Sequence, residues 1–377
     1  MSSKNMSSKF LSAALVLIGL QAEALSQATP AQDEAQQQAS RVLDAFQGHW
    51  TLDDDVSKKG DKEIIGTSTS PTPAARLDEV RSVRNAALIS NRGQLTPGDQ
   101  RELERLAGEV DAVFPGSFEA HMAEFYAEFP APSSFVHIEM AAGKDPGREE
   151  LIAPQLVNAA RKDRKEDLVR CSKAMQQRGG VAPALYQLAD DILLSVDKNG
   201  LLIAAGEMDA FPLWVLQFAS SKRPDMVVMD QRLLVDPAYR ARMWERAQAR
   251  GEVPSDAAAF MDQLPRSTSR PVFLSLAVGA SVATKYADRL SITGMAMRFG
   301  ALPDDLKLLE ERWKRMHKAT NAGPLARNYL LPGSLLLKHY RATGDEKKAA
   351  NMEAELRTLA ARLGATDQLF RNGVLQH

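Results

Sequence analysis

Apolar and polar residues in the middle of the chain follow a pattern that predicts short buried strands separated by helices. Three apolar runs bounded by turn residues have the length of strands: Leu201 to Ala205, Met226 to Asp230 and Val272 to Ala277. The intervening segments have helical character: 212–220, 237–250 and 255–263. Strands that alternate with helices in this way form βαβ units with a parallel sheet. One further alternating segment, 290–299, predicts an additional strand at an edge.

Helical periodicity dominates on both sides of this region. Thr96-Pro97-Gly98-Asp99 is a helix start signal, with Thr as the N-cap and Pro at the first helical position. Two pairs of helical segments joined by short turns predict hairpins: 149–161 with 165–177, and 333–343 with 346–363. Pairs of this length resemble tetratricopeptide units, but these two lie far apart, so we do not expect a continuous solenoid.

The N-terminus has the features of a secretory signal peptide. Lys4 and Lys9 precede an apolar stretch, 10–20, that is too short to span a bilayer, and small residues within 22–28 offer cleavage positions. We therefore expect a periplasmic or secreted protein whose mature chain has no membrane span. Residues 29–76 are rich in Gln, Ala, Ser, Thr, Pro and charged residues, which predicts a flexible linker.

Together these patterns predict an α/β fold in which a small, mainly parallel sheet is flanked by tetratricopeptide-like helical hairpins. The expected order is a signal peptide (1–28), a linker (29–76), a helical domain (77–190), an α/β core (191–300) and C-terminal helical hairpins (301–377). The chain has 377 residues and a net charge of −1. That charge balance gives no electrostatic reason to expect nucleic acid as a partner.

The polar residues that follow the first two strands are the best candidates for a site. Gly206, Glu207 and Asp209 come directly after the first strand, and Asp230 ends the second. In a parallel sheet these positions lie at the same carboxyl edge, where α/β proteins bind ligands. The carboxylates could bind a cation or a sugar hydroxyl, or take part in acid–base chemistry, and Trp214 could stack on a sugar ring.

The same residues also have structural interpretations. Asp209 could cap the helix that follows it. Glu207 could be solvated or could pair with Arg223 or Arg232. Trp214 stands at helical spacing among apolar residues, a pattern that is typical of a core side chain. The sequence leaves these alternatives open.

Other reactive residues carry weaker signals. His121 and Glu124 lie one helical turn apart, as metal ligands can, but no second histidine is near in sequence, so no metal site is predicted. His317 lies on a helix rich in Lys and Arg and is expected to be solvated. Cys171 is the only cysteine, and its amphipathic helix predicts a buried thiol. No cofactor is predicted, because no P-loop or Gly-x-Gly-x-x-Gly motif follows a strand.

Several short blocks between about residues 110 and 350 match a family pattern. They are Phe114-Pro115-Gly116-Ser117-Phe118-Glu119, Gly206 to Trp214, Arg223-Pro224-Asp225, Leu233-Leu234, Asp236-Pro237-Ala238-Tyr239, Arg270-Pro271-Val272-Phe273, Gly294-Met295-Ala296-Met297-Arg298 and Ala326-Arg327-Asn328-Tyr329. In these blocks the chain resembles the soluble extracytoplasmic region of bacterial O-mannosyltransferase-like membrane proteins, which carry Gly-Asp-Asn-Asp-Thr-Phe-Pro-Leu-Trp after a strand. Here Glu207, Met208 and Ala210 replace the Asp, Asn and Thr of that motif, which removes two polar groups from the turn.

The resemblance implies an accessory extracytoplasmic module, because the family's transferase chemistry belongs to a multi-span membrane part that is not expected in this chain. Two hypotheses follow. The first is a non-catalytic interaction or scaffold module in envelope biogenesis or surface-protein glycosylation, with an exported protein as partner. The alternative is a carbohydrate- or nucleotide-sugar-binding module, or a degenerate enzyme, whose site contains Gly206, Glu207, Asp209, Trp214 and Asp230.

Overall fold

The computed structural model describes residues 72–90, 95–178, 180–301 and 305–376. The predicted signal peptide and the linker as far as residue 71 lie outside these ranges. The described residues form two compact units, one ending at Gly180 and one beginning at Val181. The first helix among the described residues begins at Pro73, inside the range expected for the linker, and a proline is well suited to the first turn of a helix.

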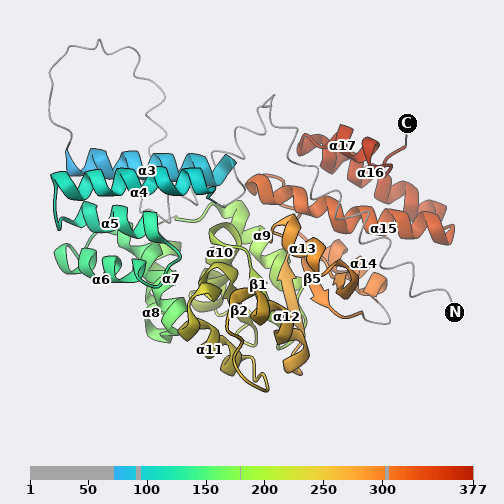
Figure 1. The fold of residues 1–377 in the computed structure, drawn as a ribbon. Helices are drawn as coiled ribbons and strands as arrows, with labels where there is room; N and C mark the ends of the chain where they lie inside the picture. Colours follow the sequence, from blue (N-terminus) through green and yellow to red (C-terminus); the bar gives the residue numbers. More distant parts are fainter. Residues whose placement is uncertain (1–71, 91–94, 179, 302–304, 377) are drawn as a thin grey trace, which may run out of the picture. The chain divides into compact units, whose positions relative to one another are not determined.

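The first unit is built from helices. Its elements are α3 (Pro73–Ser90), α4 (Pro97–Val113), α5 (Phe118–Glu128), α6 (Ser134–Lys144), η3 (Glu149–Leu151), α7 (Ile152–Lys162) and α8 (Lys165–Gln177). Helices α3, α4 and α5 pack against one another, and α6 packs against α5 (Figure 1). The predicted cap of α4 is confirmed: Thr96 Oγ1 accepts a hydrogen bond from Asp99 N (3.2 Å), and the Asp99 carboxylate accepts one from Thr96 N (2.9 Å).

Aromatic rings fill the space between α5 and α6. The ring of Phe125 lies 5.6 Å from that of Phe129 and 5.9 Å from that of Phe135, measured between centroids. The predicted hairpin over 149–177 is confirmed as α7 and α8, which are joined through Asp163 in the left-handed conformation (φ 51°). Cys171 is buried in α8 as predicted, and burial raises the pKa of its thiol to about 11.

The second unit contains a five-stranded sheet with the order β2-β1-β3-β5-β4. Its strands are β1 (Leu201–Ala204), β2 (Val227–Asp230), β3 (Val272–Ser275), β4 (Leu290–Ile292) and β5 (Ala296–Phe299). The three predicted central strands are confirmed, and β1 pairs in parallel with both β2 and β3. β5 is antiparallel to both β3 and β4. The fold belongs to the α/β class as predicted, but the sheet is mixed.

The predicted single strand over 290–299 is instead a hairpin, β4–β5. The chain reverses at Gly294, whose φ of 129° lies in a region that side chains rarely adopt. Thr293 N donates a hydrogen bond to Ala296 O (2.9 Å) and closes the turn. The sequence pattern did not predict this reversal, because Thr293, Met295 and Ala296 are all buried and the turn has no polar, exposed residues to mark it.

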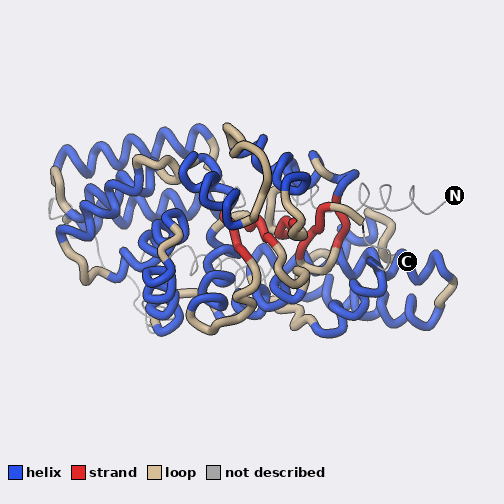
Figure 2. Tube along the Cα trace, turned by 90° about the horizontal axis from the view of Figure 1, so that it is seen from below, coloured by secondary structure: helices blue, strands red, loops and turns tan. Residues whose placement is uncertain are grey.

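Helices of the second unit surround the strands, which are drawn in red in Figure 2. They are α9 (Pro183–Leu194), α10 (Glu207–Phe218), η4 (Gln231–Val235), α11 (Pro237–Arg246), α12 (Ala257–Ser267), α13 (Ala280–Lys285), η5 (Ala287–Arg289), α14 (Asp305–Arg315), η6 (Gly323–Tyr329), α15 (Leu330–Thr343), α16 (Glu346–Arg362) and α17 (Thr366–Arg371). α9 falls in the range expected for the helical domain, but it packs on α10. No helix among the described residues combines the length and apolarity needed to cross a bilayer.

The C-terminal hairpin is confirmed as α15 and α16, which lie side by side in Figure 1. Gly344 ends α15 in the left-handed conformation (φ 71°), and Gly364 follows α16 in the same conformation (φ 58°), as predicted for a residue that closes a helix. A Cβ atom on Gly333 would lie 2.7 Å from Leu356 Cδ2 and 3.0 Å from Trp313 Cη2. A glycine is therefore required where α15 meets its neighbours.

Candidate functional site

The predicted carboxylates meet at the carboxyl edge of β1 and β2. The helix after β1 begins at Glu207, five residues earlier than expected, so that Pro212 lies inside α10 rather than in its first turn. The reason is the carboxylate of Asp209, which accepts hydrogen bonds from Ala205 N and Gly206 N (both 2.9 Å) and so caps the helix at Gly206.

Arg232 joins the other two carboxylates. Its guanidinium donates to Glu207 Oε1 at 2.8 Å and to Asp230 Oδ2 at 2.7 Å. A Cβ atom on Gly206 would lie 3.2 Å from Arg232 Cζ, so the glycine lets the guanidinium approach the turn closely. Burial works against the charged guanidinium, but the charges of Asp230 and Glu207 raise the pKa of Arg232 overall.

Asp209 is 1% exposed and interacts electrostatically with Asp230 of this cluster. Burial raises its pKa, and the nearby charge of Asp230 raises it further. The two backbone donors and a hydrogen bond from Ser275, at the end of β3, act in the opposite direction. The cluster therefore contains three carboxyl groups and one guanidinium, and its environment favours the protonated form of Asp209 more than water does.

The candidate side chains at this turn are buried. Glu207 is 4% exposed and Asp230 is fully buried. The indole of Trp214 is also buried, stacks on Phe211 at 6.0 Å between centroids, and donates to Val228 O at 3.4 Å. The structure thus brings the three carboxylates together and places Trp214 in the core beside them. Ligand binding by this cluster stays a prediction.

A cleft of about 1050 Å³ opens at the opposite edge of the sheet, where β1 and β2 begin. We call it the α9–α14 cleft. It is lined by Asp190, Asp191, Leu193, Leu194, Val196, Asp197, Lys198, Lys222, Arg223, Asp225, Leu308, Glu311, Arg312, Arg315 and His317. The walls carry charges of both signs, and leucine and valine side chains contribute apolar surface. Its volume is at the upper end of the range for small-ligand sites.

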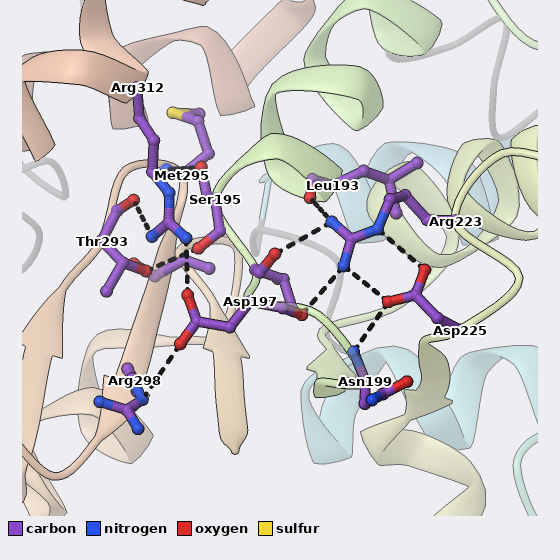
Figure 3. A network of polar contacts seen from close by, with 12 residues as sticks. Leu193, Ser195, Asp197, Asn199, Arg223, Asp225, Thr293, Met295, Arg298 and Arg312 are labelled. Atoms are coloured by element: carbon purple, nitrogen blue, oxygen red, sulfur yellow. Dashed lines mark hydrogen bonds and ion pairs between the residues drawn. The ribbon is translucent and has the colours of Figure 1, made fainter. Parts of the chain in front are cut away.

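Arg223 forms one wall of the cleft and fixes the segment that leads from α9 to β1 (Figure 3). Its guanidinium donates to the carbonyl oxygens of Leu193 (2.6 Å), Val196 (3.0 Å) and Asp197 (2.9 Å). It also forms a two-point contact with the carboxylate of Asp225, at 3.0 and 2.9 Å, which lowers the pKa of that carboxyl to about 2. The backbone of Arg223 is left-handed (φ 47°), a conformation that surrounding contacts must stabilise.

Asp197 lies at the centre of the second part of this network (Figure 3). Its carboxylate accepts a hydrogen bond from Arg312 (2.7 Å) and lies 3.5 Å from Arg298 Nε. Arg312 also donates to Thr293 O at 3.0 Å, which ties α14 to the β4–β5 turn. Burial lowers the pKa of Arg312, and Asp197 opposes that effect. The cleft wall is thus held by buried or half-buried ion pairs rather than by mobile side chains.

The sequence predicts that His317 is solvated, but the structure also pairs this side chain with a buried carboxylate. Its Nδ1 lies 2.9 Å from Asp191 Oδ1, and half of its side chain is exposed at the cleft. Asp191 is fully buried and also accepts hydrogen bonds from Tyr329 Oη (2.7 Å) and Lys318 N (3.1 Å). Burial and then the charge of Asp191 raise the pKa of Tyr329, so the phenol keeps its proton and remains a donor.

Sequence reasoning did not predict the α9–α14 cleft, although a signal for it was present. Several residues of the motif blocks meet around it: Arg223 and Asp225 on its wall, Arg298 beside Asp197, and Tyr329 on Asp191. These residues come from three blocks that are far apart in sequence. Their types indicated ion pairs, but only the fold shows that the pairs surround a single cleft.

The comparisons with known proteins concern a segment that contains the Gly206 turn and part of the α9–α14 cleft. Residues 185–263 match the family model described as TMEM260-associated domain 2. The match includes the Gly206 turn, Arg232 and the Arg223–Asp225 pair, but not the part of the cleft that α14 provides. Comparisons with the curated proteins and with the solved structures found no match. Over residues 185–263, the chain is therefore similar to TMEM260-associated domain 2.

Proposed function

We propose that the chain is an exported, non-catalytic interaction module that binds a polypeptide segment of a partner protein in the α9–α14 cleft. The partner belongs to envelope biogenesis or surface-protein glycosylation, in line with the motif resemblance to bacterial O-mannosyltransferase-like proteins. The description of the matched family names the domain by its association with TMEM260 and states no activity for it. The proposal therefore rests on the site.

The observation that carries the proposal is the composition of the cleft. Apolar side chains at 193, 194, 196 and 308 adjoin charges of both signs, as in the centre and rim of protein interfaces. Among the described lining residues none is Trp, Tyr or Phe, the side chains with the largest flat faces for stacking on a sugar ring. Lys198 and Arg315 are exposed at the cleft and able to meet an acidic group of a partner.

The rigidity of the wall supports the same function. Arg223 is held by three carbonyl oxygens and by Asp225, and Arg312 is held by Asp197 and Thr293 O. A preformed surface loses little conformational entropy when a partner binds, which favours recognition.

Charge reversal at the cleft tests this proposal. Lys198→Glu with Arg315→Glu changes two exposed cations that the cleft presents. Lys347→Glu with Arg362→Glu changes two exposed cations on α16 and is the matched control. We expect the control variant to recover the envelope proteins that co-purify with the mature chain. The cleft variant should recover at least about tenfold less of them, which corresponds to a loss of binding free energy of about 1.4 kcal/mol. Equal recovery with both variants would exclude the cleft as the binding surface.

The alternative function, a carbohydrate- or nucleotide-sugar-binding module at the Gly206 turn, has one observation in its favour. Glu207, Asp209 and Asp230 gather at the sheet edge where α/β proteins bind ligands. A ligand there would have to displace Arg232, whose side chain covers the cluster and is 16% exposed. It predicts that nucleotide sugars raise the melting temperature of the wild type and not that of Asp230→Asn. No increase in the wild type would exclude nucleotide-sugar binding at the turn.

A further inference from the structure

The first unit contains a cluster of metal-ligating side chains that the sequence did not reveal. His121 and Glu124 lie one turn apart on α5, and α6, which packs against α5, adds His137. One ligand atom from each of these three residues lies within 4.8 Å of the other two. The third ligand is sixteen positions away in the chain from the first, which is why spacing along one helix gave no sign of it.

The contacts within this cluster have the geometry of an incomplete coordination sphere. Glu124 Oε2 lies 2.6 Å from His137 Nδ1 and 3.9 Å from His121 Nδ1. Ligands of a tetrahedral zinc ion, with bonds of about 2.1 Å, are about 3.4 Å apart, which lies between these two values. Small side-chain rotations would therefore bring all three atoms to bonding distance of one ion.

The two imidazoles also lack the hydrogen bonds that buried nitrogens normally make. Nδ1 of His121 and Nδ1 of His137 are both inaccessible to solvent and neither makes a hydrogen bond of normal geometry with the described residues. Both atoms face the same carboxylate, and the ring centroids are 5.9 Å apart. A single cation can bind both nitrogens and the carboxylate oxygen together.

Glu128 completes the arrangement. It follows Glu124 by one helical turn on α5, and its Oε1 lies 3.6 Å from Nε2 of His137. A histidine that binds a metal through one nitrogen commonly directs the other toward a carboxylate, which fixes the ring orientation. Glu128 occupies that position relative to His137.

We propose that His121, Glu124 and His137 form a divalent zinc-type metal site in the first unit, with Glu128 orienting His137. Two imidazole nitrogens and one carboxylate oxygen are a donor set that zinc prefers. The side chains of the three ligands are 13–29% exposed, so the site lies near the surface although its two ligand nitrogens are covered. Three protein ligands leave the fourth position to water. The site is separate from the α9–α14 cleft and does not depend on the function proposed for it.

Zinc binding by the untagged full chain tests the proposal. We expect one tightly bound Zn²⁺ per chain in equilibrium dialysis, and at least about tenfold weaker binding in His121→Ala, His137→Ala and Glu124→Gln. Glu128→Gln should weaken binding by about tenfold, as loss of an orienting carboxylate does. His339→Ala removes a histidine from α15 and is the matched control, which we expect to bind like the wild type.

The result that would overturn the proposal is a wild-type chain that binds no zinc, or ligand variants that bind it as tightly as His339→Ala does. Circular dichroism shows whether each variant is folded, and Glu124→Gln is the variant that changes volume least. X-ray absorption at the zinc edge of the wild type gives a test that needs no variant. It should show four nitrogen or oxygen neighbours including two imidazoles, and a first shell without two imidazoles would contradict the site.

Discussion

At the residue scale, the central feature is that several charges in the second unit are buried together in sets. Arg232 lies between Glu207 and Asp230, and Arg312 meets Asp197. A buried ion pair contributes little net stability, but removal of one partner leaves an uncompensated charge and is costly. Each set therefore favours one local arrangement of the chain. Substitutions within the sets test whether the carboxylates at the Gly206 turn are structural.

Arg232→Met should reduce the free energy of unfolding by about 3–5 kcal/mol, because Glu207 and Asp230 would stay buried without their cation. The triple variant with Glu207→Gln and Asp230→Asn should recover most of that loss, since no charge is then left uncompensated. Urea unfolding measures both. Arg362→Met, at an exposed position, is the control and should change stability by less than about 0.5 kcal/mol. A near-neutral Arg232→Met would show that the cluster is not structural.

The raised pKa of Asp209 predicts how the stability of the fold depends on pH. Its folded pKa is raised above the unfolded value of 3.8, chiefly by burial, so the folded state retains a proton that the unfolded state has lost. The stability that Asp209 provides is full below pH 3.8 and is lost as pH rises through the folded pKa.

Asp209→Asn does not titrate and is the comparison for this effect. The difference in unfolding free energy, wild type minus variant, should therefore fall as pH rises above 3.8, by at most about 1.4 kcal/mol per unit. Urea titrations from pH 4.5 to 8 measure this difference. A difference that grew with pH would mean that the pKa of Asp209 is lowered and that this description of the cluster is wrong.

At the element scale, the central strands and the helical hairpins could be predicted because each carries its signal locally. Val272 to Ser275 is an apolar run after a turn, and Gly344 and Gly364 mark helix ends. The β4–β5 turn could not be predicted, because buried residues on both sides of Gly294 conceal it. The convergence of Glu207 with Asp230 followed from strand direction alone. The α9–α14 cleft could not be predicted in this way, because its lining residues, such as Asp190 and His317, are more than a hundred positions apart in sequence.

Gly294→Ala tests the importance of the β4–β5 turn. A Cβ atom there would collide with Ser195 Oγ and Met316 Cε and would lie 3.0 Å from Ser195 Cβ. Gly300→Ala is the matched control, because Gly300 also has positive φ (86°) but open space around its Cβ position. Both variants place an alanine at positive φ, so this strain is common to them. The free energy of unfolding of Gly294→Ala should be lower than that of Gly300→Ala by about 1–3 kcal/mol, because only Gly294→Ala is overpacked. Equal melting temperatures would contradict the close contact with Ser195.

At the scale of the whole molecule, the two compact units each have their own core. The first is helical and includes the phenylalanines of α5 and α6, and the second is built around the mixed sheet. Units with separate cores do not have to unfold in one cooperative step. The chain carries natural probes for each: Cys171 is buried in the first unit, and Trp214, Trp244 and Trp313 are buried in the second.

We predict that these probes report different unfolding transitions in urea. Cys171 should be unreactive toward thiol reagents in the native state, because burial raises its pKa to about 11 and shields the sulfur, and should react once the first unit opens. Tryptophan fluorescence in a Trp50→Phe background should report only the second unit. Midpoints that coincide for both probes in the same buffer would show that the two units unfold together.

Photocrosslinking of residues 29–377 in envelope extract is the direct test of the role proposed for the α9–α14 cleft. A photoreactive residue is placed in turn at Lys198 in the α9–α14 cleft, at the half-buried Met208 in the Gly206 turn, and at Lys347 on α16. We expect one protein band to be captured from position 198 and lost when Arg315→Glu is added, with no capture from 208 or 347. Capture from 208 alone would move the site to the Gly206 turn and contradict the role proposed for the cleft.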